Sequence, residues 1–330
     1  MSAAGTVGLS LALAFGSTSL STARSARVAR PSAHVRTATG SSRHGAQVSA
    51  PHEGSCPIFP ANNPLNEEIA HAPVDPNSAK YIAAIGASAH LHPDFGRNPS
   101  YGIPYAVVGP KQQRVPINFT AYGEESNPGP YPVPANAPVE GAGEAGDRHV
   151  LVLQQDVCKL YELYGAQRAG AGWNAESGAV FNLRSNVLRP EGWTSADAAG
   201  LPIFPLLVRY PEVQSGRIDH ALRVTVPNTQ RGYIHPATHF ASDSSDPNLP
   251  PMGLRLRLSA RFNLAPYHGE ALVVLRALKR YGLIVADNGS PWYITGAPDP
   301  RWNEEQLNQL KNVPGSAFEA VQSGPIRHRG

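Results

Sequence analysis

The segment RIDHALRVTVPNTQRGYIHPATHFASD, residues 217–243, sets polar side chains capable of chemistry among apolar residues. If residues 217–226 are extended, side chains alternate between two faces, so His220 shares the apolar face while Asp219 and Arg223 share the other. His220 could therefore be a catalytic group on the floor of a cleft. The alternative is a buried histidine whose ring is hydrogen-bonded within the core.

We interpret 217–243 as a β-hairpin, with Tyr233, His235 and His239 on one face of its second strand. Either histidine could pair with His220 across the hairpin. A histidine and a tyrosine on adjacent strands can act as base and acid in hydrolysis or β-elimination. His220, His235 and Tyr233 are therefore candidate catalytic residues.

Carboxylates beside aromatic residues suggest sugar chemistry, because glycoside hydrolysis usually requires two carboxyl groups. Candidate catalytic carboxylates are Asp219, Glu176 in GWNAESG and Asp287 in ADNGSPWY. The candidate substrate-binding residues near them are Trp173, Trp292, Asn288 and His239. The alternative interpretation is an Asx turn and two core tryptophans.

Arginines alternate with leucines in MGLRLRLSAR, which places Arg255 and Arg257 on one strand face. Together with Arg223 they could bind carboxylates or sulfates of a substrate through paired hydrogen bonds. The alternative is a solvated face that is balanced by acidic residues of a neighbouring strand.

The spacing of His90, His92 and Asp94 places these side chains on one side of an extended segment, where they are weak candidates for a metal site. Histidines and acids also serve in turns, so we assign no metal and expect no cofactor. No G-x-S-x-G, H-E-x-x-H, P-loop or G-x-G-x-x-G pattern occurs in the sequence. This argues against common esterases, zinc proteases, kinases and dehydrogenases.

The 31 glycines and 32 prolines of this 330-residue chain favour short strands joined by turns and loops. Strand-like alternation recurs, and 149–156 with 159–166 predicts a hairpin. Helical patterns occur at 78–85, 270–282 and a short polar stretch near 303–313, and 194–197 begins like a capped helix that Pro202 and Pro205 limit. We therefore expect a mainly β fold, a β-sandwich or jelly-roll-like single domain over 56–322 with a few short surface helices.

The N-terminus resembles a targeting segment, because an apolar run at 6–15 is followed by small residues. We expect a signal peptide over 1–25, a disordered Ser/Arg/Ala-rich linker over 26–55, and a disordered tail over 323–330. The apolar run is too short to span a bilayer, so no stable membrane insertion is expected. Cys56 and Cys158 would form a disulfide in an exported protein; two buried thiols are the alternative.

Three stretches, WTSADAAGLPIFP, PPMGLRLRLSA and VADNGSPWYITGAPDPRW, resemble a family of exported microbial proteins with no known activity. The resemblance covers most of 56–321 and implies export, but it carries no site residue.

These observations favour a secreted, extracellular carbohydrate-active enzyme, a polysaccharide hydrolase or lyase, that is a monomer. The alternatives are a non-catalytic glycan-binding or cell-envelope protein and a metal-dependent secreted enzyme. The net charge of +3 lies largely in the N-terminal tail, so nucleic acid is not an expected partner.

Overall fold

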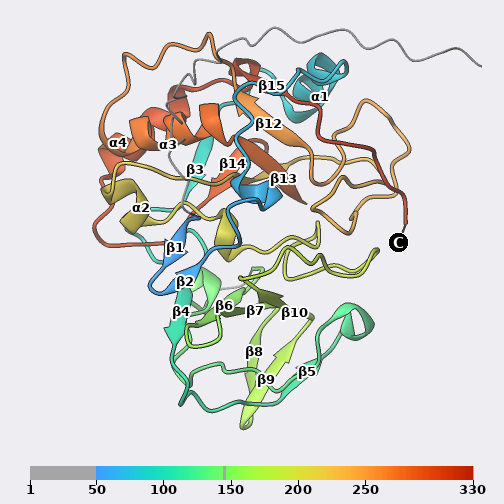
Figure 1. Ribbon diagram of the computed structural model, residues 1–330, viewed down its shortest axis with the longest axis vertical. Coiled ribbons are helices and arrows are strands. Elements are labelled where there is room, and N and C mark those ends of the chain that lie inside the picture. Colours follow the sequence, from blue (N-terminus) through green and yellow to red (C-terminus); the bar gives the residue numbers. More distant parts are fainter. Residues whose placement is uncertain (1–49, 144–145, 330) are drawn as a thin grey trace, which may run out of the picture. The chain divides into compact units, whose positions relative to one another are not determined.

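The computed structural model describes residues 50–143 and 146–329 (Figure 1). The described residues belong to one compact unit, and so do all the elements described below. The expected signal peptide, 1–25, and most of the expected linker lie outside the described residues. No helix within the described ranges is long and apolar enough to cross a membrane.

A mixed six-stranded sheet forms one half of this unit, in the order β15-β12-β13-β11-β14-β3. The strands β11 and β13 are parallel, as are β14 and β3, while the other neighbours are antiparallel. The strands of this sheet are β3 (His92–Asp94), β11 (Leu222–Val226), β12 (Arg255–Leu258), β13 (Leu283–Asn288), β14 (Tyr293–Thr295) and β15 (Phe318–Ala320).

A four-stranded sheet, β10-β7-β6-β4, and a three-stranded sheet, β5-β9-β8, make up the lower part of Figure 1. The predicted hairpin is confirmed as β6 paired with β7. The strands are β4 (Tyr105–Val108), β5 (Ile117–Phe119), β6 (Val150–Gln154), β7 (Lys159–Tyr164), β8 (Gln167–Ala169), β9 (Gly172–Ala175) and β10 (Ser177–Asn182). A short pair, β1 (His52–Glu53) and β2 (Cys56–Pro57), precedes them.

Both faces of the four-stranded sheet are buried, because apolar side chains alternate along β6. Leu151 and Leu153 belong to the main core that the six-stranded sheet shares. Val150 and Val152 belong to a second core with Trp173 of β9. The four-stranded sheet therefore separates two apolar layers, which fixes its position against the larger sheet.

The helices are few and short, and strands in several sheets make up more of the chain, so the fold is mainly β as expected. The predicted helices at 78–85 and 270–282 are confirmed as α1 (Ser78–Ile85), which Gly86 ends at φ +115°, and α3 (Gly269–Arg280). The others are α2 (Tyr210–Gln214) and α4 (Glu304–Asn308), with 3-10 turns η1 (Pro64–Asn66), η2 (Gly123–Glu125), η3 (Glu140–Gly143), η4 (Phe204–Leu206), η5 (Gln309–Asn312) and η6 (Gly315–Ala317). The sandwich or jelly-roll arrangement stays a prediction.

The interpretation of 217–243 as a hairpin is wrong. Strand β11 ends at Val226 and pairs with β13 and β14, not with the following segment. Pro227 and Pro236 lack the backbone N–H groups that a second ladder strand would need. Tyr233 instead forms isolated bridges to Met252 and Arg327.

The predicted disulfide between Cys56 and Cys158 is confirmed. It joins β2 to the turn between β6 and β7 across 102 residues of chain. The bond therefore ties the start of the described unit to the four-stranded sheet.

Candidate functional site

Two polar cavities adjoin at the place where the open end of the β6–β7 hairpin meets the carboxyl ends of β11 and β13. Their volumes are about 400 Å³ and about 280 Å³, which together match the size of ordinary ligand pockets. Asp147, Asp287 and Asn288 line both cavities. We call these three residues the junction, since they stand between the first, larger cavity and the second, smaller one.

A β-bulge brings Asp287 into the cavities. Ile284 pairs with Arg223 and Val285 with Val224, but Asp287, not Ala286, pairs with Thr225. The extra residue turns Asp287 onto the face of Arg223 and Thr225 instead of the apolar face. The backbone N–H of Ala199 donates to the carbonyl of Ala286, which compensates for the irregular pairing.

Arg223 binds the carboxylates around it. Its Nε and Nη2 donate to the two oxygens of Asp197 at 2.8 and 3.0 Å, and Nη2 also donates to Asp287 Oδ2 at 3.0 Å. Its Nη1 donates to Thr295 Oγ1 at 3.0 Å. Arg223 and Asp197 are almost fully buried. Arg223 therefore positions Asp287 and Asp197, whereas the sequence had suggested that it binds substrate.

Asp287 combines burial with access to the cavities, because 24% of its side chain is exposed. Burial raises its pKa, Arg223 opposes this, and the nearby Asp197 charge adds to it, with a net rise to about 6. A carboxyl group with a pKa near 6 can hold a proton and release it close to neutral pH.

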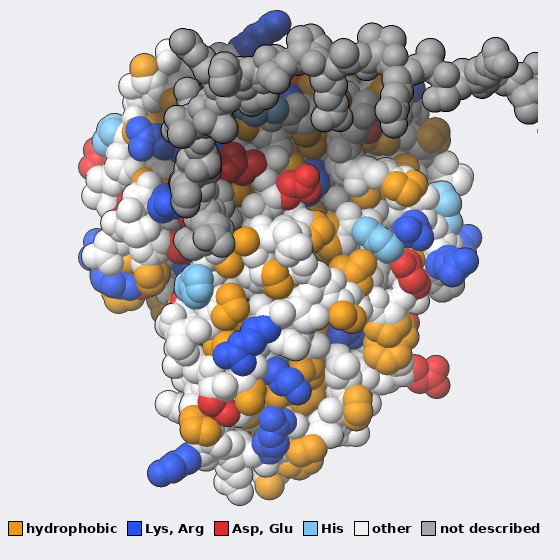
Figure 2. Space-filling model, in the orientation of Figure 1, with side chains coloured by type: hydrophobic (Ala, Val, Ile, Leu, Met, Phe, Trp, Pro, Cys, Tyr) orange, Lys and Arg blue, Asp and Glu red, His pale blue; other side chains and the backbone are white. Residues whose placement is uncertain are grey.

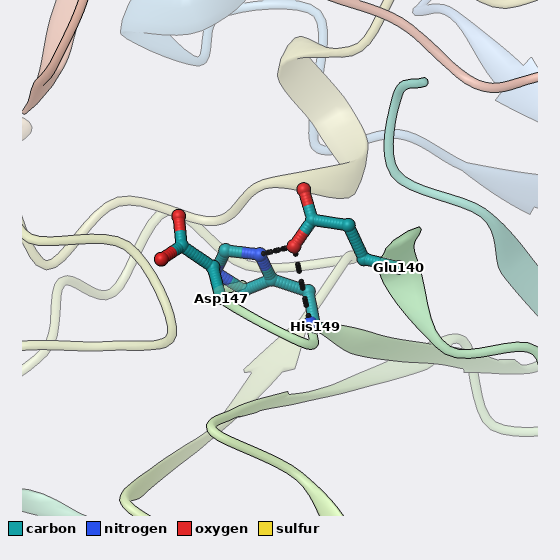
Figure 3. Close-up of side chains that lie close together, drawn as sticks. All are labelled: Glu140, Asp147 and His149. Carbon is teal, nitrogen blue, oxygen red and sulfur yellow. Dashed lines mark hydrogen bonds and ion pairs between the residues drawn. The ribbon is translucent and has the colours of Figure 1, made fainter. Parts of the chain in front are cut away.

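His149 and Glu140 form a buried ion pair beside the junction (Figure 3). His149 Nδ1 lies 2.5 Å from Glu140 Oε2, and Nε2 lies 2.8 Å from the carbonyl oxygen of Ala196. Burial lowers the pKa of His149, but the Glu140 carboxylate outweighs this and raises it to about 9. At neutral pH the imidazolium donates from both nitrogens.

Asp147 completes a group that could hold a metal, since ligand atoms of Glu140, Asp147 and His149 lie within 4.8 Å of one another. Two ligands at about 2.0–2.2 Å from one ion are separated by roughly 3 Å or more at tetrahedral or right angles. The 2.5 Å between Nδ1 and Oε2 is shorter, as in a charge-assisted hydrogen bond. Figure 3 shows the exposed Asp147 carboxylate without a bond to either partner.

The walls of the first cavity carry aromatic and hydroxyl groups. Tyr122, which is 47% exposed, and Tyr164 line it together with Ser177 and Ser195. Both serine hydroxyls donate to backbone carbonyls, Ser177 to Ser195 and Ser195 to Asp197 and Leu201. These bonds commit the hydroxyl protons to the protein, which is unsuited to a serine nucleophile.

Four of the predicted substrate, catalytic or metal residues besides Asp287 lie at these cavities: Asn288 at both, His239 at the first, and Arg223 and Asp94 at the second. His239 Nδ1 donates to the carbonyl of Ala198 at 2.8 Å. The position of Asp94 at the second cavity is explained by its strand. β3 pairs with β14, which places Asp94 opposite Thr295, and both residues line this cavity. The expected strand face of Arg223 and Thr225 is confirmed, since both line the second cavity.

The predicted catalytic histidines and Tyr233 line neither cavity. His220 is fully buried and bonds Glu212 and the carbonyl of Ala221, as in the core-histidine alternative. Tyr233 donates to one carboxylate oxygen of Glu191, and His235 bonds the other. The expected pairing of His220 with His235 or His239 is wrong, because the segment after β11 does not pair with β11 and the three histidines bond different partners.

The other predicted residues also lie away from the junction. Asp219 pairs with Arg217, and Glu176 lines neither cavity. Trp292 and Trp173 are buried core residues, as in the alternative interpretation. Trp292 donates to the carbonyl of Gly86.

Arg255 and Arg257 are buried, so their face is not solvated, but Glu319 of the neighbouring strand β15 balances Arg257 as that alternative expected. Arg255 donates to the carbonyls of Pro64 and Tyr281, and Arg257 donates to three carbonyls of 69–72 and to Glu319. Neither guanidinium lines the two cavities.

His90, His92 and Asp94 do not form a group of converging ligand atoms in the described part of the chain. His90 lies in an isolated bridge to Pro314, and His92 stacks on Tyr293 with ring centroids 4.0 Å apart. Burial lowers the pKa of His92.

The sequence interpretation missed Glu140, Asp147, His149 and Asp197. Glu140 begins the 3-10 turn η3 and the other three lie in loops, where the sequence pattern does not indicate which distant strand they approach. One usable signal existed: Asp147 and His149 stand immediately before the apolar strand β6.

No family model, curated protein or solved structure matches this chain.

Proposed function

We propose that this protein is an exported glycoside hydrolase that cleaves its substrate at the junction. The observation that carries the proposal is that Asp147 and Asp287 line both cavities. A chain bound across the two cavities would have sugar units on either side of these carboxyl groups. A glycosidase requires this arrangement, since its two carboxyl groups flank the bond that is broken.

Asp287 is the general acid in this proposal. Its pKa of about 6 keeps part of the population protonated near neutral pH, and Arg223 with the backbone N–H of Asn288 fixes its orientation. Asp287 donates its proton to the glycosidic oxygen while the bond between that oxygen and the anomeric carbon breaks. The sugar that leaves is thereby released as a neutral alcohol.

Asp147 is the second carboxyl group. Its side chain is exposed, and its carboxylate makes no hydrogen bond or ion pair to another described residue. It can remove a proton from an attacking water, which gives inversion, or bond the anomeric carbon directly, which gives retention. In both routes water adds across the glycosidic bond.

Several features support a glycan over other substrates. Tyr122, Tyr164 and Tyr293 border the two cavities, and aromatic faces pack against the C–H faces of sugar rings. The disulfide is consistent with an oxidising, extracellular compartment. Because Tyr233 and His235 lie away from the cavities, hydrolysis is favoured over the elimination for which they were candidates. A raised carboxyl pKa in a cleft favours an enzyme over a binding protein.

The test is an assay of the purified protein on neutral, amino-sugar and uronate-containing polysaccharides. Reducing ends and the absorbance of unsaturated products are followed together. We expect reducing ends alone to rise. Asp287→Asn and Asp147→Asn should each lower kcat by about 10²–10⁴-fold. The matched control is Asp156→Asn, an exposed residue in the turn at the other end of the same hairpin, which should retain activity.

Release of unsaturated products would exclude hydrolysis. Binding of a glycan without any cleavage would leave the non-catalytic alternative. Unchanged kcat in Asp287→Asn would remove this residue from the chemistry.

A further inference from the structure

The second cavity is lined by more acidic than basic groups. Its carboxyl groups belong to Asp94, Glu140, Asp147 and Asp287, and its cationic groups to Arg223 and His149. This excess of acid is local. On the face drawn in Figure 2, Lys and Arg side chains gather over the lower part of the molecule, which contains β4–β10.

Both cationic groups are already committed to protein acceptors. Arg223 donates hydrogen bonds from its guanidinium N–H groups to Asp197, Asp287 and Thr295. His149 directs one ring nitrogen to Glu140 and the other to the carbonyl of Ala196. Four of the five N–H donors of Arg223 and both ring donors of His149 are therefore in use, and Asp197, Asp287 and Glu140 balance their charges, so an anionic ligand would meet an excess of carboxylates.

Two carboxylates, in contrast, have unused acceptor capacity. Asp94 and Asp147 make no side-chain hydrogen bond or ion pair within the described ranges. Burial raises the pKa of Asp94, which means that its surroundings solvate the negative charge poorly. A bound cation would relieve that cost.

From this charge distribution we infer that the second cavity binds a sugar that carries a protonated amine, so that the substrates are amino-sugar glycans. The inference rests on the proposed function. An ammonium group is a hydrogen-bond donor only, and the unpaired carboxylates of Asp94 and Asp147, which both line this cavity, are acceptors for such a group. A uronate would place a fourth or fifth negative charge among these carboxylates and would be rejected.

A metal ion fits this cavity less well than an ammonium group. Calcium requires six to eight oxygen ligands that converge to about 2.3–2.6 Å from one point. Among the described residues the converging group is Glu140, Asp147 and His149, and it does not include Asp94. The carboxylates surround a space of about 280 Å³, as an organic cation requires.

The experiment compares oligosaccharides of matched length: glucosamine, N-acetylglucosamine, glucose and galacturonate oligomers. The pH is set below the amine pKa of the glucosamine oligomer. Cleavage is measured with the full protein, and binding by calorimetry with Asp287→Asn. We expect kcat/KM and affinity for the glucosamine oligomer to exceed those for the acetylated oligomer by about tenfold or more. Added salt should reduce this preference.

Asp94→Asn tests the residue behind the preference. It should lower kcat/KM for the glucosamine oligomer by a larger factor than for the acetylated one, mainly through KM. Asp156→Asn should leave the preference unchanged. A thermal denaturation curve for Asp94→Asn separates loss of binding from loss of fold.

The outcomes distinguish the two proposals. Cleavage without preference for the amine overturns this inference and leaves the glycosidase proposal standing. Asp94-dependent binding of the glucosamine oligomer without cleavage overturns the glycosidase proposal alone. Absence of both binding and cleavage overturns both. Calcium binding in calorimetry that Asp94→Asn abolishes would assign these carboxylates to an ion and overturn the amine inference.

Discussion

Two arginines of the six-stranded sheet, Arg223 and Arg255, lie at equivalent positions on either side of β13 but have different roles. Ile284 of β13 pairs with Arg223 of β11 on one side and with Arg255 of β12 on the other. Paired residues share a face of the sheet, so both arginines project to the same side, roughly 10 Å apart across two strand spacings. Both are about 95% buried.

The difference lies in their acceptors. Arg255 donates to backbone carbonyls, which never titrate, and burial lowers its pKa to about 10. Arg223 donates to two carboxylates. Burial lowers its pKa, but Asp197 outweighs burial and raises the pKa above its usual range. One arginine fastens a loop, while the other holds an acid whose proton can move. Burial and residue type alone do not separate these roles; the partner does.

The largest expected effect is at Arg223. Arg223→Met should reduce the free energy of unfolding by about 3–5 kcal/mol, because it leaves the buried Asp197 carboxylate without a cation. Urea denaturation measures this. The double variant with Asp197→Asn should recover part of that stability but not the activity, since Asp287 remains unanchored. If Arg223→Met reduced the free energy of unfolding by less than about 1 kcal/mol, Arg223 would not be the cation that compensates the buried Asp197 carboxylate.

Much of this arrangement was predictable from local pattern. Alternation along 222–226 placed Arg223 and Thr225 on one face, and the β6–β7 hairpin, α1, α3 and the disulfide followed from periodicity and cysteine count. These features depend on neighbours in sequence, which a single chain displays.

The remainder depends on contacts between distant segments. The bulge at Ala286 decides which way Asp287 points, yet no glycine or proline marks it. Asp197 reaches Arg223 from a loop, and Glu140 reaches His149 from the 3-10 turn η3. The histidines of 217–243 suggested a site by their number, but Pro227 and Pro236 direct that chain away from the sheet.

The second largest effect is expected at Arg255, and on stability alone. Arg255→Met removes charged hydrogen bonds to the buried carbonyls of Pro64 and Tyr281, which should cost about 2–3 kcal/mol. kcat and KM of the folded fraction should stay unchanged. A tenfold fall in kcat, measured where the variant is fully folded, would give Arg255 the same role as Arg223.

The His149–Glu140 pair, which lies near Arg223, should make the free energy of unfolding depend on pH. The folded pKa of His149, about 9, lies above the unfolded value of about 6.5, so the imidazolium is stabilised by folding. This contribution is complete below pH 6.5 and disappears as the pH rises through 9. The difference in unfolding free energy between wild type and His149→Gln should therefore shrink by about 3 kcal/mol across that window. A difference that is constant with pH would mean that the pair is not ionic.

The smallest effect is expected at the exposed rim of the first cavity, where no buried charge is involved. Tyr122, 47% exposed, lines the first cavity, whereas Tyr101, 56% exposed, lines neither. Tyr122→Ala should raise KM by about 3–10-fold through loss of aromatic contact with the sugar, with kcat and unfolding free energy nearly unchanged. Tyr101→Ala should change none of the three. Equal KM values for both variants would show that the substrate does not cross this rim, and the carboxylates of the junction would then be approached from the second cavity alone.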